Sequence, residues 1–111
     1  MSHLDEKEIL QYRQIFTETD GDMSAMFNVL SEINRYRIFL LLLEPERFSI
    51  SNIAKILSIS VPLTSQHVTT LVNAGLLKKQ RNGKRIYPKI EHLDPLVRKI
   101  ILTLKKIAQP T

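Results

Sequence analysis

An Asn-Gly pair at positions 82 and 83 constrains the fold of this chain more than any other short stretch. It lies in Arg81-Asn82-Gly83-Lys84, between the β-prone runs LLKKQ and KRIYPKI. Both central residues of a type I′ turn need a positive φ, which Asn and Gly adopt at little cost. The pair therefore predicts a tight β-hairpin over about residues 76–90.

The spacing of apolar residues predicts helices in most of the remaining chain. Acidic residues open the first helix, at residues 5–17, and Asp22 can cap the second. A third helix begins near Asn34 and runs until Pro45 stops it. Its centre is apolar nearly all round, which predicts the buried helix of the domain.

Two further helices precede the hairpin. Ser49 or Ser51 can cap a short helix at residues 51–58, and a second follows after a three-residue turn, at about residues 62–74. Gly75 can close this second helix as a left-handed cap. The inward faces are predicted to carry Ile53, Ile56 and Leu57 on the first helix and Val68, Leu71 and Val72 on the second.

Positive charge is concentrated in one part of the chain. The formal net charge is +5, yet residues 48–90 contain no Asp or Glu and carry +7, which leaves −2 for the remainder. A cationic segment on a slightly acidic protein indicates a polyanion as partner. A solvated surface that happens to be basic is the alternative.

Several classes of protein are not expected. The chain has no cysteine, so it forms no disulfide, thiolate metal site or cysteine nucleophile. It has no apolar run near the roughly 20 residues that span a bilayer, and its acidic start does not form a secretory signal. No nucleophile–base set or glycine-rich phosphate loop occurs. We therefore expect a cytoplasmic protein with no membrane contact, no cofactor and no catalytic activity.

The order of elements predicts a function. Two helices joined by a tight turn and followed by a basic hairpin make a winged helix-turn-helix, a mainly α fold with a small β-hairpin wing. The second helix can enter the major groove of double-stranded DNA, and the hairpin can hold the neighbouring backbone. Candidate contacts on the helix are Ser60, Thr64, Ser65, Gln66, His67, Thr69 and Thr70. Those on the wing are Lys78, Lys79, Arg81, Asn82, Lys84 and Arg85.

These two groups differ in chemistry. Gln66 can bond adenine in bidentate fashion, and Ser65 or Thr69 can contact bases or phosphates. The wing cations attract the DNA backbone without reading sequence. Leu63 also faces outward on this interpretation and either meets a thymine methyl group or packs locally.

The outermost helices predict a homodimer. The first carries Ile9, Tyr12 and Phe16 on one side, and the last carries Leu93, Leu96, Val97, Ile100, Ile101, Leu104 and Ile107. A small domain does not readily bury so many apolar side chains alone, so a pairing surface is expected. A last helix that faces only its own core is the alternative. The single domain, 1–111, would then comprise N-terminal helices at 5–33, a winged core at 34–90 and a dimerisation helix at 92–108.

Residues 27–90 resemble the core of ArsR-type winged-helix repressors. The resemblance rests on Arg35 and Arg37 in their leucine-rich helix, on the segment from Ser60 to Leu71 with its SQH, and on NAGLLKKQRNGKRIYPKI. It implies a homodimer whose two recognition helices read a palindromic operator. It also implies that His67 corresponds to the family's recognition-helix histidine, in contact with DNA or packed against the hairpin.

The metal chemistry known in this family does not carry over. Metal-sensing members place a Cys-x-Cys pair where this chain has FSISNIA, and others place ligands on the last helix, where it has LVRKIILTLKKIA. His92 and Asp94 stand at the start of that helix, but no second His or Glu follows at a useful spacing. No metal site is expected.

Two other functions are consistent with the sequence. One is a winged-helix module that binds a protein and no DNA, supported by the lack of charge on the recognition helix. The other is an architectural protein that binds DNA without sequence preference. The operator, the regulated genes and any effector ligand cannot be derived from the residues.

Overall fold

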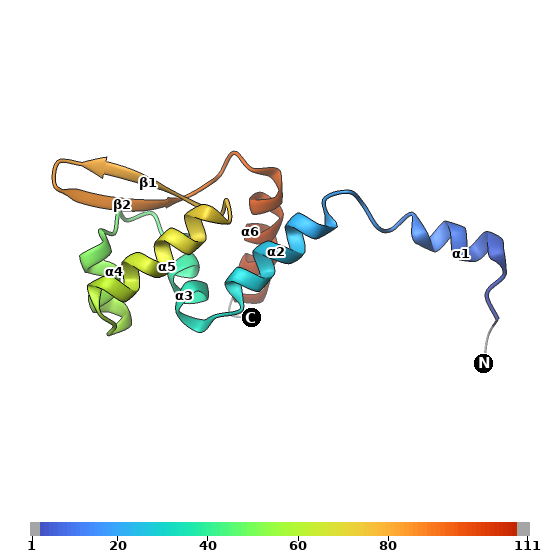
Figure 1. Cartoon of the computed structure of the whole chain (residues 1–111), viewed down its shortest axis with the longest axis horizontal. Coiled ribbons are helices and arrows are strands. Elements are labelled where there is room, and N and C mark those ends of the chain that lie inside the picture. The colour runs from blue at the N-terminus through green and yellow to red at the C-terminus, as the bar shows by residue number, and fades with distance from the viewer. Residues whose placement is uncertain (1–2, 109–111) are drawn as a thin grey trace.

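The computed structural model describes residues 3–108, and within that range it is mainly helical with one two-stranded antiparallel sheet. The elements are α1 (Glu6–Arg13), α2 (Asp20–Leu30), α3 (Ile33–Leu41), α4 (Ile50–Leu57), α5 (Val61–Asn73), β1 (Leu77–Asn82), β2 (Arg85–Ile90) and α6 (Pro95–Ala108). All but α1 gather in one body (Figure 1). The predicted class, mainly α with a hairpin wing, is confirmed. No helix among these residues has both the length and the apolar character needed to cross a membrane.

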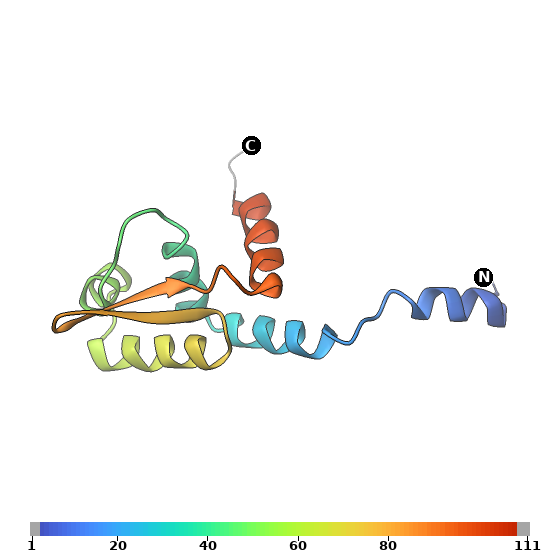
Figure 2. The ribbon, with the colours of Figure 1, turned by 90° about the horizontal axis from the view of Figure 1, so that it is seen from above.

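One hydrophobic core joins the elements of this body. Ile38 and Phe39 of α3 are both 0% exposed, as the apolar centre of that helix predicts. In Figure 2 the hairpin lies between α5 and the connection from α3 to α4. Of the residues predicted to face inward, Ile53, Val68 and Leu71 are fully buried, and Leu57 and Val72 are partly buried. The prediction that Ile56 faces inward is wrong: it is 54% exposed. Ile53 and Ala54 form the buried side of α4, and Ile56, two residues after Ala54, lies on the opposite side of the helix.

The sequence sets both ends of α4. The Ser49 hydroxyl accepts a hydrogen bond from the Asn52 N–H at 3.1 Å, and the Asn52 side chain accepts one from the Ser49 N–H at 3.0 Å. This reciprocal pair satisfies two donors that a helix start leaves open. Ser58 ends the helix in the left-handed conformation, with φ 57°. The three-residue turn to α5 therefore begins with an abrupt change of chain direction.

Gly75 closes α5, as predicted, with φ +80°. The Gly75 N–H donates to the Val72 carbonyl and the Leu76 N–H to the Leu71 carbonyl, both at 3.0 Å. These two bonds form a Schellman motif, which usually brings its flanking apolar residues together. Leu71 and Leu76 are both 0% exposed. The cap thus fixes how α5 passes into the wing.

The hairpin forms where expected, but with a different turn. Asn82 pairs with Arg85 across the strands, so Gly83 and Lys84 are the two turn residues. Only Gly83 has a positive φ there, +63°. The predicted type I′ turn centred on Asn82 and Gly83 is therefore wrong. A positive φ at the first turn residue alone matches a type II′ turn, for which Gly at that position suffices.

The N-terminal helices differ from their expected bounds. α1 ends at Arg13 rather than near residue 17. α2 begins at Asp20, so the predicted cap at Asp22 is wrong, because Asp22 lies in the first turn of the helix. The Asp20 carboxylate accepts hydrogen bonds from the Thr17 N–H at 2.9 Å and from its hydroxyl at 3.0 Å, which stabilises the turn before α2. α1 has no buried residue, and it stands apart from the body in both views (Figures 1 and 2).

The apolar stripe of α6 is divided between core and surface. Val97, Ile100, Ile101 and Leu104 are between 0% and 9% exposed within a single chain. Their prediction as dimer residues is wrong, because a side chain already buried in its own core has almost no surface left for a partner. Leu96 is partly buried, whereas Leu93 and Leu102 are 75% and 66% exposed.

Candidate DNA interface

The outer face of α5 forms an open groove. Ser65, Gln66, Thr69 and Thr70 line it, together with Arg35, Pro62 and His67, and its volume is about 720 Å³. Gln66, Thr69 and Thr70 are exposed and Ser65 is partly so. The Thr70 hydroxyl donates to the Gln66 backbone carbonyl at 3.1 Å, and no hydrogen bond among residues 3–108 uses the Gln66 side-chain amide. These four side chains therefore lie where the prediction placed them, on an uncharged and slim helix face.

Thr64 does not belong to this face. It is 0% exposed, and its hydroxyl donates to the Ser60 carbonyl at 2.8 Å. The prediction that Thr64 contacts DNA is wrong, because the hydroxyl is used inside the helix and the methyl group lies in the core. Ser60 is exposed, and its oxygen caps α5 by accepting from the Leu63 N–H at 3.2 Å. The Ser60 oxygen accepts in this cap, so the Ser60 O–H can still donate to an outside partner. The predicted contact of Ser60 with DNA stays a prediction.

His67 is held on the inner margin of α5. Its side chain is 12% exposed, and its Nδ1 lies 3.3 Å from Nη1 of Arg35 in α3. Because a guanidinium can only donate, Nδ1 accepts and the ring proton sits on Nε2. That proton points toward Glu32, whose Oε2 lies 3.7 Å from Nε2. His67 therefore helps to hold α5 against α3 while one edge of its ring lines the groove, and its predicted contact with DNA stays a prediction.

Arg35 extends this contact to α2. Its Nε donates to the Val29 carbonyl at 2.7 Å, in the last turn of α2, where helix carbonyls lack partners. Its backbone N–H donates to the Glu32 carboxylate at 3.0 Å, so Glu32 caps α3. Glu32, Arg35 and His67, called here the polar triad, thus join α2, α3 and α5.

Glu32 stays ionised in the polar triad. Burial opposes its charge, but hydrogen bonds from the backbone N–H groups of Arg35 and Asn34, together with the positive charge of Arg35 and that of His67 when its ring is protonated, outweigh burial and lower its pKa below the ordinary 4.5. At neutral pH a negative charge therefore lies beside Arg35 and His67.

The wing exposes its cations. Lys79, Arg81, Lys84 and Arg85 are all exposed, and the one ion pair among residues 3–108 is that between His67 and Glu32. Lys79 Nζ lies 3.2 Å from the Thr69 hydroxyl, so the base of the wing meets the outer face of α5. The wing cations therefore have no carboxylate partner in the described range and remain available to an anion.

A second cleft links the wing to both helices of the motif. Its volume is about 270 Å³, and its lining includes Ser51 of α4, Ser65 of α5, and Lys84 and Arg85 of the wing. One surface thus runs from the start of α4, past α5, to the tip of the wing.

Lys78 lies on a different side. Side chains alternate across a strand, so Lys78 points away from the face that carries Lys79. It lines a separate cavity with Arg47, Tyr87 and Lys89. Its predicted contact with the DNA backbone stays a prediction, and Asn82, at the exposed end of β1, stays one as well.

Sequence reasoning missed Glu32 and Arg35 as residues of the site. Arg35 and His67 are 32 positions apart, so no local spacing connects them. One feature of the sequence did indicate that His67 faces inward: it lies three residues after Thr64 and four before Leu71, beside the inward stripe of α5. Within residues 3–108, no three potential metal-ligating His, Cys, Asp or Glu side chains come together.

Comparison with known proteins identifies the family. A family model described as a helix-turn-helix domain matches residues 30–80. A CadC homolog of Staphylococcus aureus, a cadmium resistance transcriptional regulatory protein, is 32% identical over 90 residues, which cover 78% of this chain and 74% of that protein. The chain belongs to the ArsR family.

Solved structures agree in fold with this assignment. The transcriptional repressor BigR of Xylella fastidiosa aligns with a TM-score of 0.72 at 20% identity, over 89% of this chain and 98% of that one. A homodimeric winged helix-turn-helix DNA-binding domain of Mycobacterium bovis, described as a possible ArsR-family regulator, aligns with a TM-score of 0.65 at 18% identity, over 97% and 90%.

ArsR-family proteins are DNA-binding transcription regulators and not an enzyme class. The chain spans 62% of the length of two other relatives, the CadC proteins of Listeria innocua and Lactococcus lactis, at 31% identity over 74 residues. Those relatives are named for cadmium resistance, whereas this ArsR-family chain contains no cysteine from which a thiolate metal site could be built.

Proposed function

We propose that this protein is a homodimeric, sequence-specific repressor that blocks access to a promoter and does not sense metal through cysteine. The observation that carries the proposal is the groove along the uncharged outer face of α5, beside a wing whose cations form no ion pair within the described residues. As a prokaryotic regulator it would act at the nucleoid, in the cytoplasm. Repression is supported by the likeness to BigR, which is described as a repressor.

The two surfaces have separate physical tasks. Gln66 carries an amide that can donate to and accept from one adenine, and Ser65 and Thr69 are small enough not to block its approach. The wing cations release counterions from the phosphates, which contributes affinity for any sequence. Selectivity would therefore come from α5 and most of the binding free energy from the wing.

Dimerisation is supported by the exposed apolar side chains of α1 and of the segment that follows it, which holds Phe16. Leu10, Tyr12 and Phe16 are 58%, 56% and 72% exposed, and Ile9 is 37% exposed. A helix of eight residues that buries nothing in its own chain lacks the packing that stabilises most helices in proteins. A second copy of the chain would supply that packing and would place two α5 helices on the two halves of a palindromic operator.

Duplex selection and titration test the proposal. Sequences bound from a random pool should share a palindrome, and affinity for that duplex should fall roughly 10³- to 10⁵-fold between about 50 and 200 mM salt, for about 6 to 10 phosphate contacts. Transcription from the promoter that holds this sequence should rise when the gene is deleted. A fall would identify an activator instead.

Two substitutions test the division of tasks. Gln66→Ala should remove about 1–3 kcal/mol of discrimination at one base position of each half-site. Arg81→Ala should weaken all duplexes alike and reduce the salt dependence, because it removes a phosphate contact. The measurement is fluorescence anisotropy on the selected duplex and on single-base variants.

The alternatives give different results in the same assay. Equal effects of Gln66→Ala and Arg81→Ala on all duplexes would contradict sequence reading by α5. Equal affinity of the wild type for unrelated duplexes would identify an architectural protein. Absence of salt-dependent binding to any duplex would favour a module that binds a protein.

A further inference from the structure

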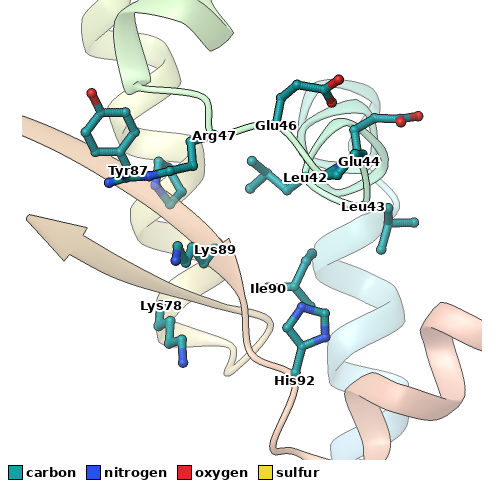
Figure 3. Close-up of a pocket in the computed structure, with 12 residues that line it drawn as sticks. Leu42, Leu43, Glu44, Glu46, Arg47, Lys78, Tyr87, Lys89, Ile90 and His92 are labelled. Atoms are coloured by element: carbon teal, nitrogen blue, oxygen red, sulfur yellow. The ribbon is translucent and has the colours of Figure 1, made fainter.

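A cavity that the DNA interface does not use lies at the base of the wing, on the far side of the hairpin from α5 (Figure 2). Its volume is about 430 Å³, within the range of roughly 300–1,000 Å³ for small-molecule sites. The connection from α3 to α4 forms one wall and β2 with Lys78 forms the other (Figure 3). It shares no lining residue with the groove of α5.

The cavity has an apolar floor. Leu43 is only partly buried and offers open apolar surface, whereas Leu42, Pro88 and Ile90 also line the cavity but are buried and expose little of their side chains. The aliphatic side chains of Leu43 and Ile90 lie together on one side of the cavity in Figure 3. Such a floor favours the apolar part of a ligand over water.

Its rim is cationic on the side of the wing. Lys78 and Lys89 are directly opposite each other in the hairpin, an arrangement of like charges that destabilises a strand pair. The Arg47 guanidinium lies 4.2 Å from the centroid of the Tyr87 ring, which holds it in place by a cation–π contact. No hydrogen bond among residues 3–108 uses these three cationic groups.

No carboxylate among residues 3–108 forms an ion pair with these groups. Glu44 and Glu46 line the cavity, but they lie across it from Lys78 and Lys89 (Figure 3), and neither forms an ion pair within the described range. His92, at the third side, can add a further donor. Three cations beside an apolar surface match a molecule with one anionic group and an apolar body.

We infer that this cavity binds a small organic anion, with a carboxylate, sulfonate or phosphate group between Lys78, Lys89 and Arg47 and an aryl or alkyl body against the apolar side of the cavity, chiefly Leu43. Because the anion offsets positive charge at the base of the wing, its binding lowers affinity for DNA. This second consequence rests on the proposed function, whereas the binding site itself does not.

The site is tested on the full chain without DNA. The probe is 1-anilinonaphthalene-8-sulfonate, and its control is N-phenyl-1-naphthylamine, which has the same rings and no sulfonate. The anion should bind about tenfold more tightly or better, and amide NMR shifts should change at residues 42–47 and 87–92. Equal affinity of the two probes, or shift changes confined to α1 and α6, would overturn the inference.

A matched pair of variants isolates the cationic rim. Lys78→Gln combined with Lys89→Gln should weaken binding of the sulfonate probe about tenfold and leave the neutral probe unaffected. Lys79→Gln, one residue along β1 but on the opposite face, should change the affinity for neither probe. An equal loss of affinity for the sulfonate probe in the double variant and in Lys79→Gln would show only a general attraction of anions to the wing. That result would overturn the proposed site. NMR spectra of the variants confirm that they are folded.

A DNA titration tests whether the bound anion lowers affinity for DNA, separately from whether the anion binds at all. At saturating sulfonate probe, affinity for the selected duplex should fall about fivefold or more, and DNA should weaken binding of the probe by the same factor. Binding of the probe without this coupling would overturn the regulatory consequence and retain the site. Failure of all duplexes to bind would contradict the proposed function without affecting the result for the probe.

Discussion

Arg35 uses one side chain to hold three helices in place. It donates to the Val29 carbonyl at the end of α2 and to His67 of α5, while Glu32 caps the helix that carries it. Hydrogen bonds to charged groups contribute about 1.5–3 kcal/mol when they are partly buried. The direction of α5, and therefore the presentation of Gln66, depends on this contact as well as on apolar packing.

Glu32→Ala should lower the free energy of unfolding by about 1 kcal/mol at pH 7, because it removes the cap of α3. The pKa of Glu32 is depressed in the folded state, so its contribution is present above its ordinary pKa of 4.5 and is lost as the pH falls below that value. Urea unfolding between pH 7 and pH 3 should show the two proteins converging at the acidic end. The control is Glu44→Ala, at an exposed carboxylate. A constant difference across the whole pH range would contradict an electrostatic role for Glu32.

At the scale of the element, the backbone conformation of single residues decides where helices and strands end. Ser58 and Gly75 both have positive φ, and they end α4 and α5. Gly83 has the same property in the turn of the wing. A side chain with a Cβ atom is strained in this region, so only a few residue types suit these three positions.

Two glycines provide a matched test of this point. An added Cβ would meet no atom within 4 Å at Gly21 or at Gly83, but only Gly83 has a positive φ. Gly83→Ala should therefore lower the free energy of unfolding by about 1 kcal/mol, and Gly21→Ala, in the first turn of α2, should raise it by up to about 1 kcal/mol. Urea unfolding of both variants is the measurement. Changes of the same sign would show that backbone conformation is not what distinguishes the two positions.

At the scale of the whole molecule, α1 is the element that a single chain leaves unpacked. The body formed by α2 to α6 buries its own core, including four residues of α6 that the sequence assigned to a partner. The proposed pairing surface is therefore narrower than predicted. It consists of the apolar side of α1 together with exposed residues such as Leu93 and Leu102.

Leu10→Asp combined with Phe16→Asp should convert the proposed dimer to a monomer in sedimentation equilibrium. Both side chains are exposed in the single chain, so the fold of the body should persist in circular dichroism. Affinity for a palindromic duplex should fall at least about 100-fold, because the two half-sites would be bound independently. Ile56→Asp, on the exposed side of α4, is the control and should leave the dimer intact. An unchanged mass of the double variant would exclude α1 from the interface.

Local chemistry was sufficient to predict the order of elements. Helix caps at Ser49, Ser60 and Gly75, and a glycine turn at residue 83, act within a few residues, so short stretches of sequence indicate them. The same applies to the outer face of α5, because helical spacing separates Gln66 and Thr69 from Val68 and Leu71.

Contacts between distant segments could not be predicted in this way. The polar triad turns His67 inward, and the core of a single chain encloses Thr64 and much of the stripe on α6. Periodicity shows that a side chain faces one side of a helix, but not which neighbour covers that side. The number of strands, the place of the wing and its charge therefore followed from sequence. The partners of His67, the depth of α6 and the cavity beside Tyr87 depend on how the helices pack in three dimensions.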